Sequence, residues 1–205
     1  MSRRYSQVEL EDAATMKDAL NVVFKSLKKD YGFQLARQRF LCCVSCACAD
    51  IAQRSEDRVN AGKPPITKWA FYHRQDANDM GHGVHIGYGD TVDEGQAIVD
   101  AALAAGLVVS WDGDIHTRPF LMTPAAAERW VNEGLRRARE CERDLADIIA
   151  RGGTTHRYSI DDNAWGDYPV DVDAYRRSID KLKNRAATLS YPPDPVAQDF
   201  DYAVS

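Results

Sequence analysis

The chain has 205 residues, of which 44% are hydrophobic and 28% charged, and its formal net charge at pH 7 is -5. This size and balance are typical of one globular domain with an appendage, and they argue against a disordered chain or two equal domains. No apolar run approaches the roughly 18 residues of a spanning helix, and residues 1–5 lack the apolar core of a signal peptide. We therefore expect a cytoplasmic protein without a membrane partner. The absence of a long basic run also argues against nucleic acid as a partner.

The first third of the chain predicts two helices. Ser6 and Glu9 have the spacing of a capping box, and apolar residues then recur every three or four positions until Gly32. Residues 33–40 form a short segment that can be extended. A second helix is predicted over residues 44–59, because asparagine, glycine and two prolines follow it.

The next segment changes from helical to strand periodicity. Aromatic and β-branched residues predict strands at 69–73 and 82–88, and Thr91 with Glu94 caps a helix that ends at Gly106. Asp112-Gly113 then predicts a hairpin between strands at 107–111 and 115–120. The order is ββαββ, so we expect an α+β domain over residues 1–122 with a four-stranded sheet and packed helices.

Residues 123–191 predict a helical extension, and residues 192–205 a loose acidic tail. A long helix begins at Thr123-Pro124 and ends at Gly152-Gly153, and a polar loop containing Trp165 and Tyr168 follows. An apolar seam is then predicted on Val172, Tyr175, Ile179, Leu182, Ala186 and Leu189. The seam can pack on the long helix of the same chain or across a two-fold axis, and we favour the homodimer.

Four of the five cysteines occupy seven positions, as Cys42, Cys43, Cys46 and Cys48. Three interpretations fit this cluster. The small side chains can let a helix pack closely on the sheet, or Cys42, Cys43 and Cys46 can bind zinc with His73 as the completing ligand. One cysteine can instead be a reactive thiolate, with Arg37 and Arg39 nearby to stabilise its negative charge.

A second polar group follows the first predicted strand, at the position where rigid scaffolds display functional side chains. His73 can act as a base to a cysteine, with Gln75 or Asp76 orienting its ring. A simple hydrogen-bonded histidine at a strand end is the alternative. The ligand-binding candidates are Tyr72, His73, Gln75, Asp76, Trp111 and Asp112. His82 and His85 are three residues apart on a predicted strand, which places them on opposite faces.

Four motifs, taken in order, resemble an uncharacterised bacterial domain family. They are Phe40-x-Cys42-Cys43-x-x-Cys46, Phe71-Tyr72-His73-x-Gln75-Asp76, Tyr88-Gly89 and Gly106-Leu107-x-Val109-x-Trp111-Asp112-Gly113. The resemblance covers roughly residues 32–120. It implies a shared α+β fold and marks the cysteines and the His73 to Asp76 loop, but it implies no activity.

Three classes of function stay open at this point. The first is a binding or regulatory module whose site is formed by the cysteine cluster and the His73 to Asp76 loop. The second is an enzyme, either a zinc enzyme or a cysteine-dependent hydrolase. The third is a phage or mobile-element accessory protein that acts by protein contact.

Overall fold

The computed structural model describes residues 7–37, 44–78, 80–89, 91–159 and 164–193. It divides into unit 1, formed by Met1–Ala127 with Thr188–Ser205, and unit 2, formed by Glu128–Ala187. Helices and mainly antiparallel sheets together confirm the α+β class. In these ranges no helix has the length and apolar character needed to cross a membrane.

Three helices of unit 1 begin and end close to the predicted residues, namely α1 (Gln7–Lys29), α2 (Val44–Asn60) and α4 (Val92–Ala104). The short α3 (Arg74–Asn78) lies where the sequence predicted a loop. Thr91 is the N-cap of α4 and its hydroxyl accepts from the Glu94 amide at 3.3 Å. Gly106 follows α4 with φ of 79°, a conformation that glycine adopts without strain and that ends the helix.

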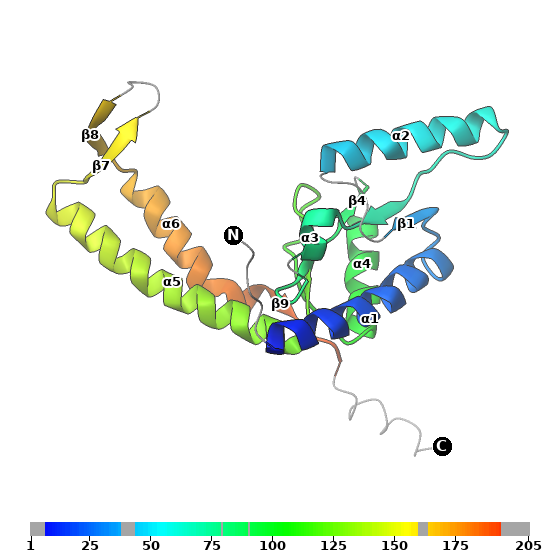
Figure 1. Cartoon of the computed structure of the whole chain (residues 1–205), viewed down its shortest axis with the longest axis horizontal. Coiled ribbons are helices and arrows are strands. Elements are labelled where there is room, and N and C mark those ends of the chain that lie inside the picture. The colour runs from blue at the N-terminus through cyan, green and yellow to red at the C-terminus, as the bar shows by residue number, and fades with distance from the viewer. Residues whose placement is uncertain (1–6, 38–43, 79, 90, 160–163, 194–205) are drawn as a thin grey trace, which may run out of the picture. The chain divides into compact units, whose positions relative to one another are not determined.

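The first sheet lies between two helices, as Figure 1 shows for α1 and α2. It contains β1 (Leu35–Arg37), β2 (Trp69–Phe71) and β4 (Gly87–Tyr88), with β1 parallel and β4 antiparallel to the central β2. Neighbouring side chains point to opposite faces of a strand. Ala70 therefore joins the core that includes α1, while Phe71 packs with Ala47 and Ile51 of α2.

The second sheet has four strands in the order β3 (Val84–His85), β6 (Phe120–Met122), β5 (Val108–Ser110) and β9 (Leu189–Ser190). A four-stranded sheet was predicted, but its strands differ. The strand expected at 82–88 is split at Ile86, whose amide bonds to the Pro119 carbonyl at 2.9 Å. Its two halves pair with different strands, β6 and β2, so the expected ββαββ sheet becomes two sheets.

The predicted tight hairpin at Asp112-Gly113 is a longer loop. Strands β5 and β6 do pair, but Ser110 is opposite Phe120, so residues 111–119 all lie in the connection. The cause is side-chain hydrogen bonding inside this segment, described below, which competes with extension of the ladder.

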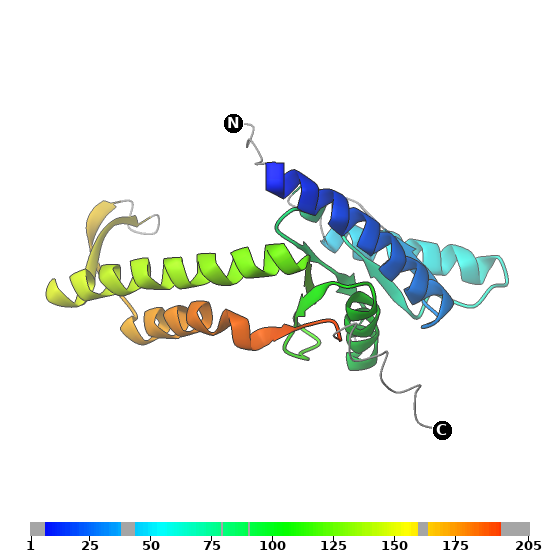
Figure 2. The same cartoon turned by 90° about the horizontal axis from the view of Figure 1, so that it is seen from below.

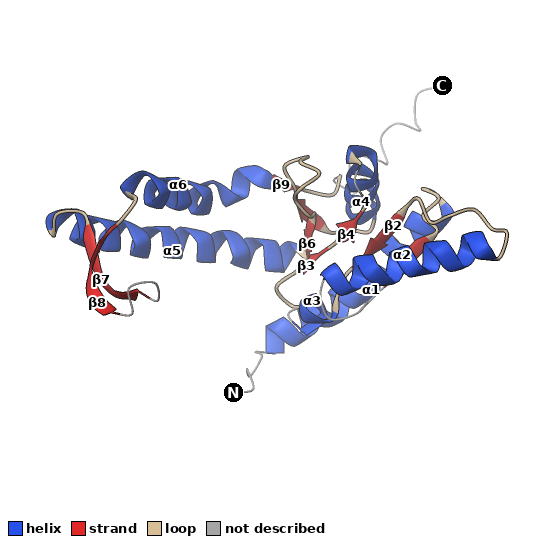
Figure 3. Cartoon of the chain, turned by 90° about the horizontal axis from the view of Figure 1, so that it is seen from above, coloured by secondary structure: helices blue, strands red, loops and turns tan. Residues whose placement is uncertain are grey.

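Unit 2 contains a helical pair and a β-hairpin. Helix α5 (Pro124–Ala150) enters this unit and runs beside α6 (Val172–Lys183), as Figures 2 and 3 show. Between them β7 (Thr154–Ser159) pairs with β8 (Ala164–Pro169), so the segment predicted as a polar loop with Trp165 and Tyr168 is a hairpin. Gly152 and Gly153, both with positive φ, start it.

The apolar seam packs within the chain. Val172, Tyr175, Ile179 and Leu182 of α6 contact a cluster formed with Ala138, Cys141 and Leu145 of α5. Two predicted seam residues are elsewhere: Ala186 is exposed in the 3₁₀ helix Asn184–Thr188, and Leu189 belongs to β9. The intramolecular helical pair therefore forms, and the homodimer that we favoured stays a prediction.

Candidate functional site

The His73 to Asp76 loop forms a compact polar group in unit 1. His73 caps α3 and is 6% exposed, and its Nδ1 lies 2.9 Å from Oδ2 of Asp76. The backbone amide of His73 also donates to this carboxylate oxygen at 3.4 Å. Both contacts join the Asp76 side chain to the residue before α3, so they stabilise the start of this helix whatever else they do.

The partners of His73 define its tautomer. Nη1 of Arg118 lies 3.4 Å from Nε2, and a guanidinium can only donate, so Nε2 must accept and the ring proton is on Nδ1. That proton is then directed at Asp76. The Asp76 amide also approaches Nδ1, at 3.4 Å, but a protonated nitrogen cannot accept it. Nδ1 therefore either donates to the carboxylate or accepts from the amide. The contact with the carboxylate is the shorter one, so we assign Nδ1 as the donor.

Asp76 connects this pair to a second histidine. Its Oδ1 lies 3.8 Å from Nδ1 of His85, whose ring stacks on Phe120 with centroids 4.4 Å apart. Burial raises the pKa of Asp76, but its interactions with His85, His73 and Arg118 outweigh burial, and the pKa is lowered. Asp76 is therefore ionised at neutral pH, although its side chain is only 11% exposed.

We call His73, Asp76, His85 and Arg118 the Asp76 cluster. Only His73 and Asp76 were among the predicted site residues. His85 and Arg118 were missed because the pairing of β3 with β6, which places His85 opposite Phe120, brings them together. No local pattern in the sequence predicts that His85 pairs with Phe120. In the cluster His85 is the most open of the three measured side chains, with 44% exposure, compared with 8% for His73.

The other predicted site residues have different surroundings. Tyr72 is 1% exposed, and its ring packs edge-on against Phe24 of α1 with centroids 5.9 Å apart. Gln75 belongs to α3, but its side chain lies outside the described part of the structure. His82 is paired with Glu9 at 2.9 Å and takes no part in the Asp76 cluster.

Trp111 and Asp112 organise the loop between β5 and β6. The Trp111 indole donates to the Asp114 carbonyl at 3.2 Å, and Asp112 accepts from the Thr117 hydroxyl and, at 3.1 Å, from the Asp114 amide. The Thr117 hydroxyl and then the Asp114 amide lower the pKa of Asp112. Tyr88 of the Tyr-Gly motif donates into the same loop, so two separate motifs meet here. The hydrogen bonds of Tyr88, Trp111 and Asp112 described here all end within the loop, and none of them involves a residue of the Asp76 cluster.

Comparison with known proteins assigns most of unit 1 to a family. The model of DUF6891, a domain of unknown function, matches residues 2–123. The chain belongs to this family. The match extends upstream of the resemblance and includes α1, while α5 and the rest of unit 2 lie beyond it. No curated protein and no solved structure matches the chain significantly.

Within the DUF6891 domain the cysteines are only partly described. Cys42 and Cys43 lie outside the described residues, whereas Cys46 and Cys48 are exposed on the first turns of α2. The residue between them, Ala47, is fully buried, so it makes the helix contact that one interpretation gave to the cysteines. Among the described histidines, cysteines and acids no group of three is arranged to hold a metal ion. The zinc site stays a prediction.

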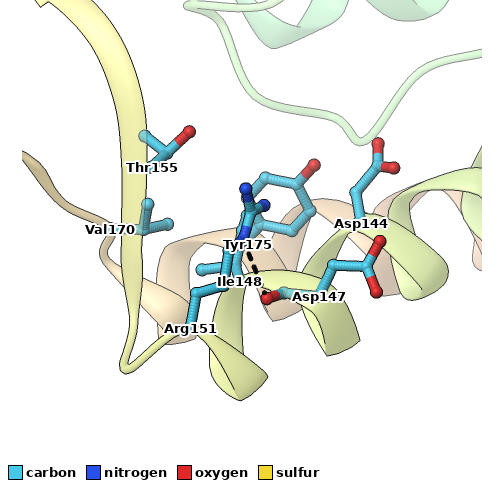
Figure 4. A pocket seen from close by; sticks show the side chains of 7 residues that line it. All are labelled: Asp144, Asp147, Ile148, Arg151, Thr155, Val170 and Tyr175. Atoms are coloured by element: carbon cyan, nitrogen blue, oxygen red, sulfur yellow. Dashed lines mark hydrogen bonds between the residues drawn. The ribbon is translucent and has the colours of Figure 1, made fainter. Parts of the chain in front are cut away.

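A cavity of about 420 Å³ lies in unit 2, beyond the DUF6891 match. Figure 4 shows that the end of α5, the hairpin and the first turn of α6 surround it. Its lining combines the charged groups Asp144, Asp147 and Arg151 with Ile148, Thr155, Val170 and Tyr175. The sequence analysis assigned Tyr175 to the apolar seam and found no site here, because the hairpin that forms one wall was not predicted.

Proposed function

We propose that the DUF6891 domain is a binding module whose ligand contacts the Asp76 cluster and the cysteine segment at the start of α2. The supporting observation is an ionised, largely buried carboxylate between two imidazoles, one of which also contacts a guanidinium. A helix cap needs only the contacts between His73 and Asp76. The additional partners His85 and Arg118 are the part that a ligand role would explain.

The open member of the cluster is the proposed ligand contact. Asp76 orients the His85 ring through Nδ1 and Phe120 supports its face, while 44% of the side chain stays accessible. A carboxylate that contacts one ring nitrogen of a histidine commonly fixes the ring so that the other nitrogen can bind a ligand. Figures 1 and 3 both draw the beginning of α2 beside α3, which supports a site that also includes the cysteine segment. Two of the four motifs that carried the resemblance in the sequence lie on these segments, which is consistent with this proposal.

The test is recovery of a bound molecule from protein purified from a bacterial lysate. Native mass spectrometry before and after denaturation would detect a released ligand. His85→Gln should lose it, whereas the control His116→Gln, on an exposed part of the loop after β5, should retain it. Inorganic phosphate and Zn²⁺ are then added as probes. Binding is measured as shifts of the NMR signals of the histidine rings. Equal responses of His85 and His116 would contradict the proposal.

A cysteine-dependent enzyme is the second candidate, because the contact between His73 and Asp76 is that of a base and its orienting acid. Arg118 weakens this role for His73, since it occupies the nitrogen that would take the thiol proton. An enzyme of this type should have one cysteine that iodoacetamide alkylates much faster than Cys141. Slow alkylation of every thiol, together with no metal by elemental analysis, would reject both the thiolate and the zinc enzyme.

The remaining expectations stay predictions of the sequence: the cytoplasmic location, the exclusion of nucleic acid, and the action of the chain as a phage or mobile-element accessory protein by protein contact. A pull-down from lysate tests the last of these, because an accessory protein would retain a stoichiometric partner whereas an enzyme need not.

A further inference from the structure

The cavity of unit 2 has the dimensions of a small-molecule site. Its volume of about 420 Å³ falls in the range of ligand pockets, and three different elements contribute its walls. The hairpin contributes Thr155 on β7 and Val170 directly after β8. All of these elements belong to unit 2, so the cavity does not depend on unit 1.

One part of the lining is apolar. Ile148 is 7% exposed, and Val170 and the ring of Tyr175 lie on either side of it (Figure 4). Burial, followed by the neighbouring Cys141 and Asp144, raises the pKa of the Tyr175 phenol. The hydroxyl therefore keeps its proton at neutral pH. These groups form a surface for an apolar substituent with a hydroxyl at its edge.

The other part of the lining carries both signs of charge. Asp144 and Asp147 are three residues apart on α5, which places them on one face of the helix. Nε of Arg151 donates to the backbone carbonyl of Asp147 at 3.2 Å, which anchors the guanidinium. In Figure 4 the guanidinium lies beside Tyr175, while both carboxylates lie further from the hairpin. Within the described part of unit 2, none of these three side chains has an ion-pair partner.

We propose that this cavity binds a small zwitterion with an apolar substituent, of which a free α-amino acid is the simplest example. The ligand carboxylate pairs with Arg151 beside the Thr155 hydroxyl. The ligand ammonium lies between Asp144 and Asp147, and the substituent packs on Ile148. A purely cationic ligand would make no ion pair with the exposed Arg151, and a purely anionic one would face the two exposed carboxylates. This site is separate from the Asp76 cluster and does not rest on its function.

The test uses the full chain and three probes that share one isobutyl group. L-leucine carries both charges, isoamylamine lacks the carboxylate, and 4-methylpentanoate lacks the ammonium. Millimolar leucine should shift the backbone amide NMR signals of residues 144–151 in a saturable way. Each single-charge probe should bind about ten-fold more weakly or worse, because it loses one charge-assisted contact.

Variants locate the binding. Asp144→Asn and Arg151→Gln should each weaken leucine binding about ten-fold. The matched controls Asp180→Asn and Arg176→Gln change the same charges on exposed positions of α6 outside the cavity, and should leave it unchanged. Arg151→Gln also removes a helix-end contact, so circular dichroism must show that it stays folded, and Asp144→Asn provides the result if it does not.

Three outcomes would overturn the proposal. Equal binding of isoamylamine and leucine would mean a cation site, and equal binding of 4-methylpentanoate would mean an anion site. The absence of saturable shifts at residues 144–151 with leucine, methionine and phenylalanine would mean that the cavity does not take this class of ligand.

Discussion

Asp76→Asn tests whether the charge of the Asp76 cluster stabilises the domain. Asparagine keeps the shape and one acceptor oxygen but removes the negative charge that faces His73 at 2.9 Å and His85 at 3.8 Å. A hydrogen bond to a charged group contributes about 1 kcal/mol more than one between neutral groups. With the His73 contacts as the main loss and the longer His85 contact adding less, we expect the unfolding free energy to fall by about 2 kcal/mol at pH 7.

The stabilisation by Asp76 should decrease as the pH falls. The pKa of Asp76 is lower in the folded state than its ordinary value of 3.8. The contribution is therefore fully present above that value, where both states are ionised. It decreases as pH falls, because the unfolded chain takes up a proton first, and it is lost below the folded pKa. The difference between wild type and Asp76→Asn should shrink over the same range.

Urea denaturation at a series of pH values measures this difference, and melting should show a loss of about 4–8 °C near neutral pH. The control is Asp18→Asn, on an exposed position of α1, which should change stability little. Two results would refute the reasoning. One is equal stability of Asp76→Asn and wild type at pH 7. The other is a stability difference that stays constant as the pH falls well below 3.8.

Three further predictions concern packing. Gly89→Ala should destabilise the DUF6891 domain by about 1–2 kcal/mol in urea denaturation, because a Cβ would clash with the buried Glu94 carboxylate and displace it; unchanged stability would mean that the Glu94 side chain moves aside at no cost. Thr123→Ala should lower the free energy of unfolding by about 2 kcal/mol, since the buried hydroxyl both caps α5 and donates to Asp12 at 3.1 Å. A decrease of less than about 0.5 kcal/mol would be too small for both roles. Leu182→Asp should increase hydrogen exchange of α6 amides without changing the mass measured by light scattering; a fall in mass would instead support the homodimer.

The helices could be predicted from the sequence because their signals are local. Caps, glycines and apolar spacing lie within a few residues of each boundary, and α1, α2, α4 and α5 agree with them closely. The hairpin of unit 2 was missed because its residues are mostly polar and lack a tight-turn signal. The end of the seam was wrong because Leu189 pairs with β5, a contact between residues far apart in the chain.

The α+β class, the boundaries of α1, α2, α4 and α5, and one half of the candidate site could be predicted from the sequence. His73 and Asp76 are three residues apart, so a single helical turn is enough to pair them. Only the tertiary structure added His85 and Arg118 to that pair, and only it closed the cavity between α5, the hairpin and α6. For the Asp76 cluster the cause is strand register. Backbone hydrogen bonding is nearly independent of side-chain identity, so the alignment of distant strands follows from burial of the whole core and not from any local pattern.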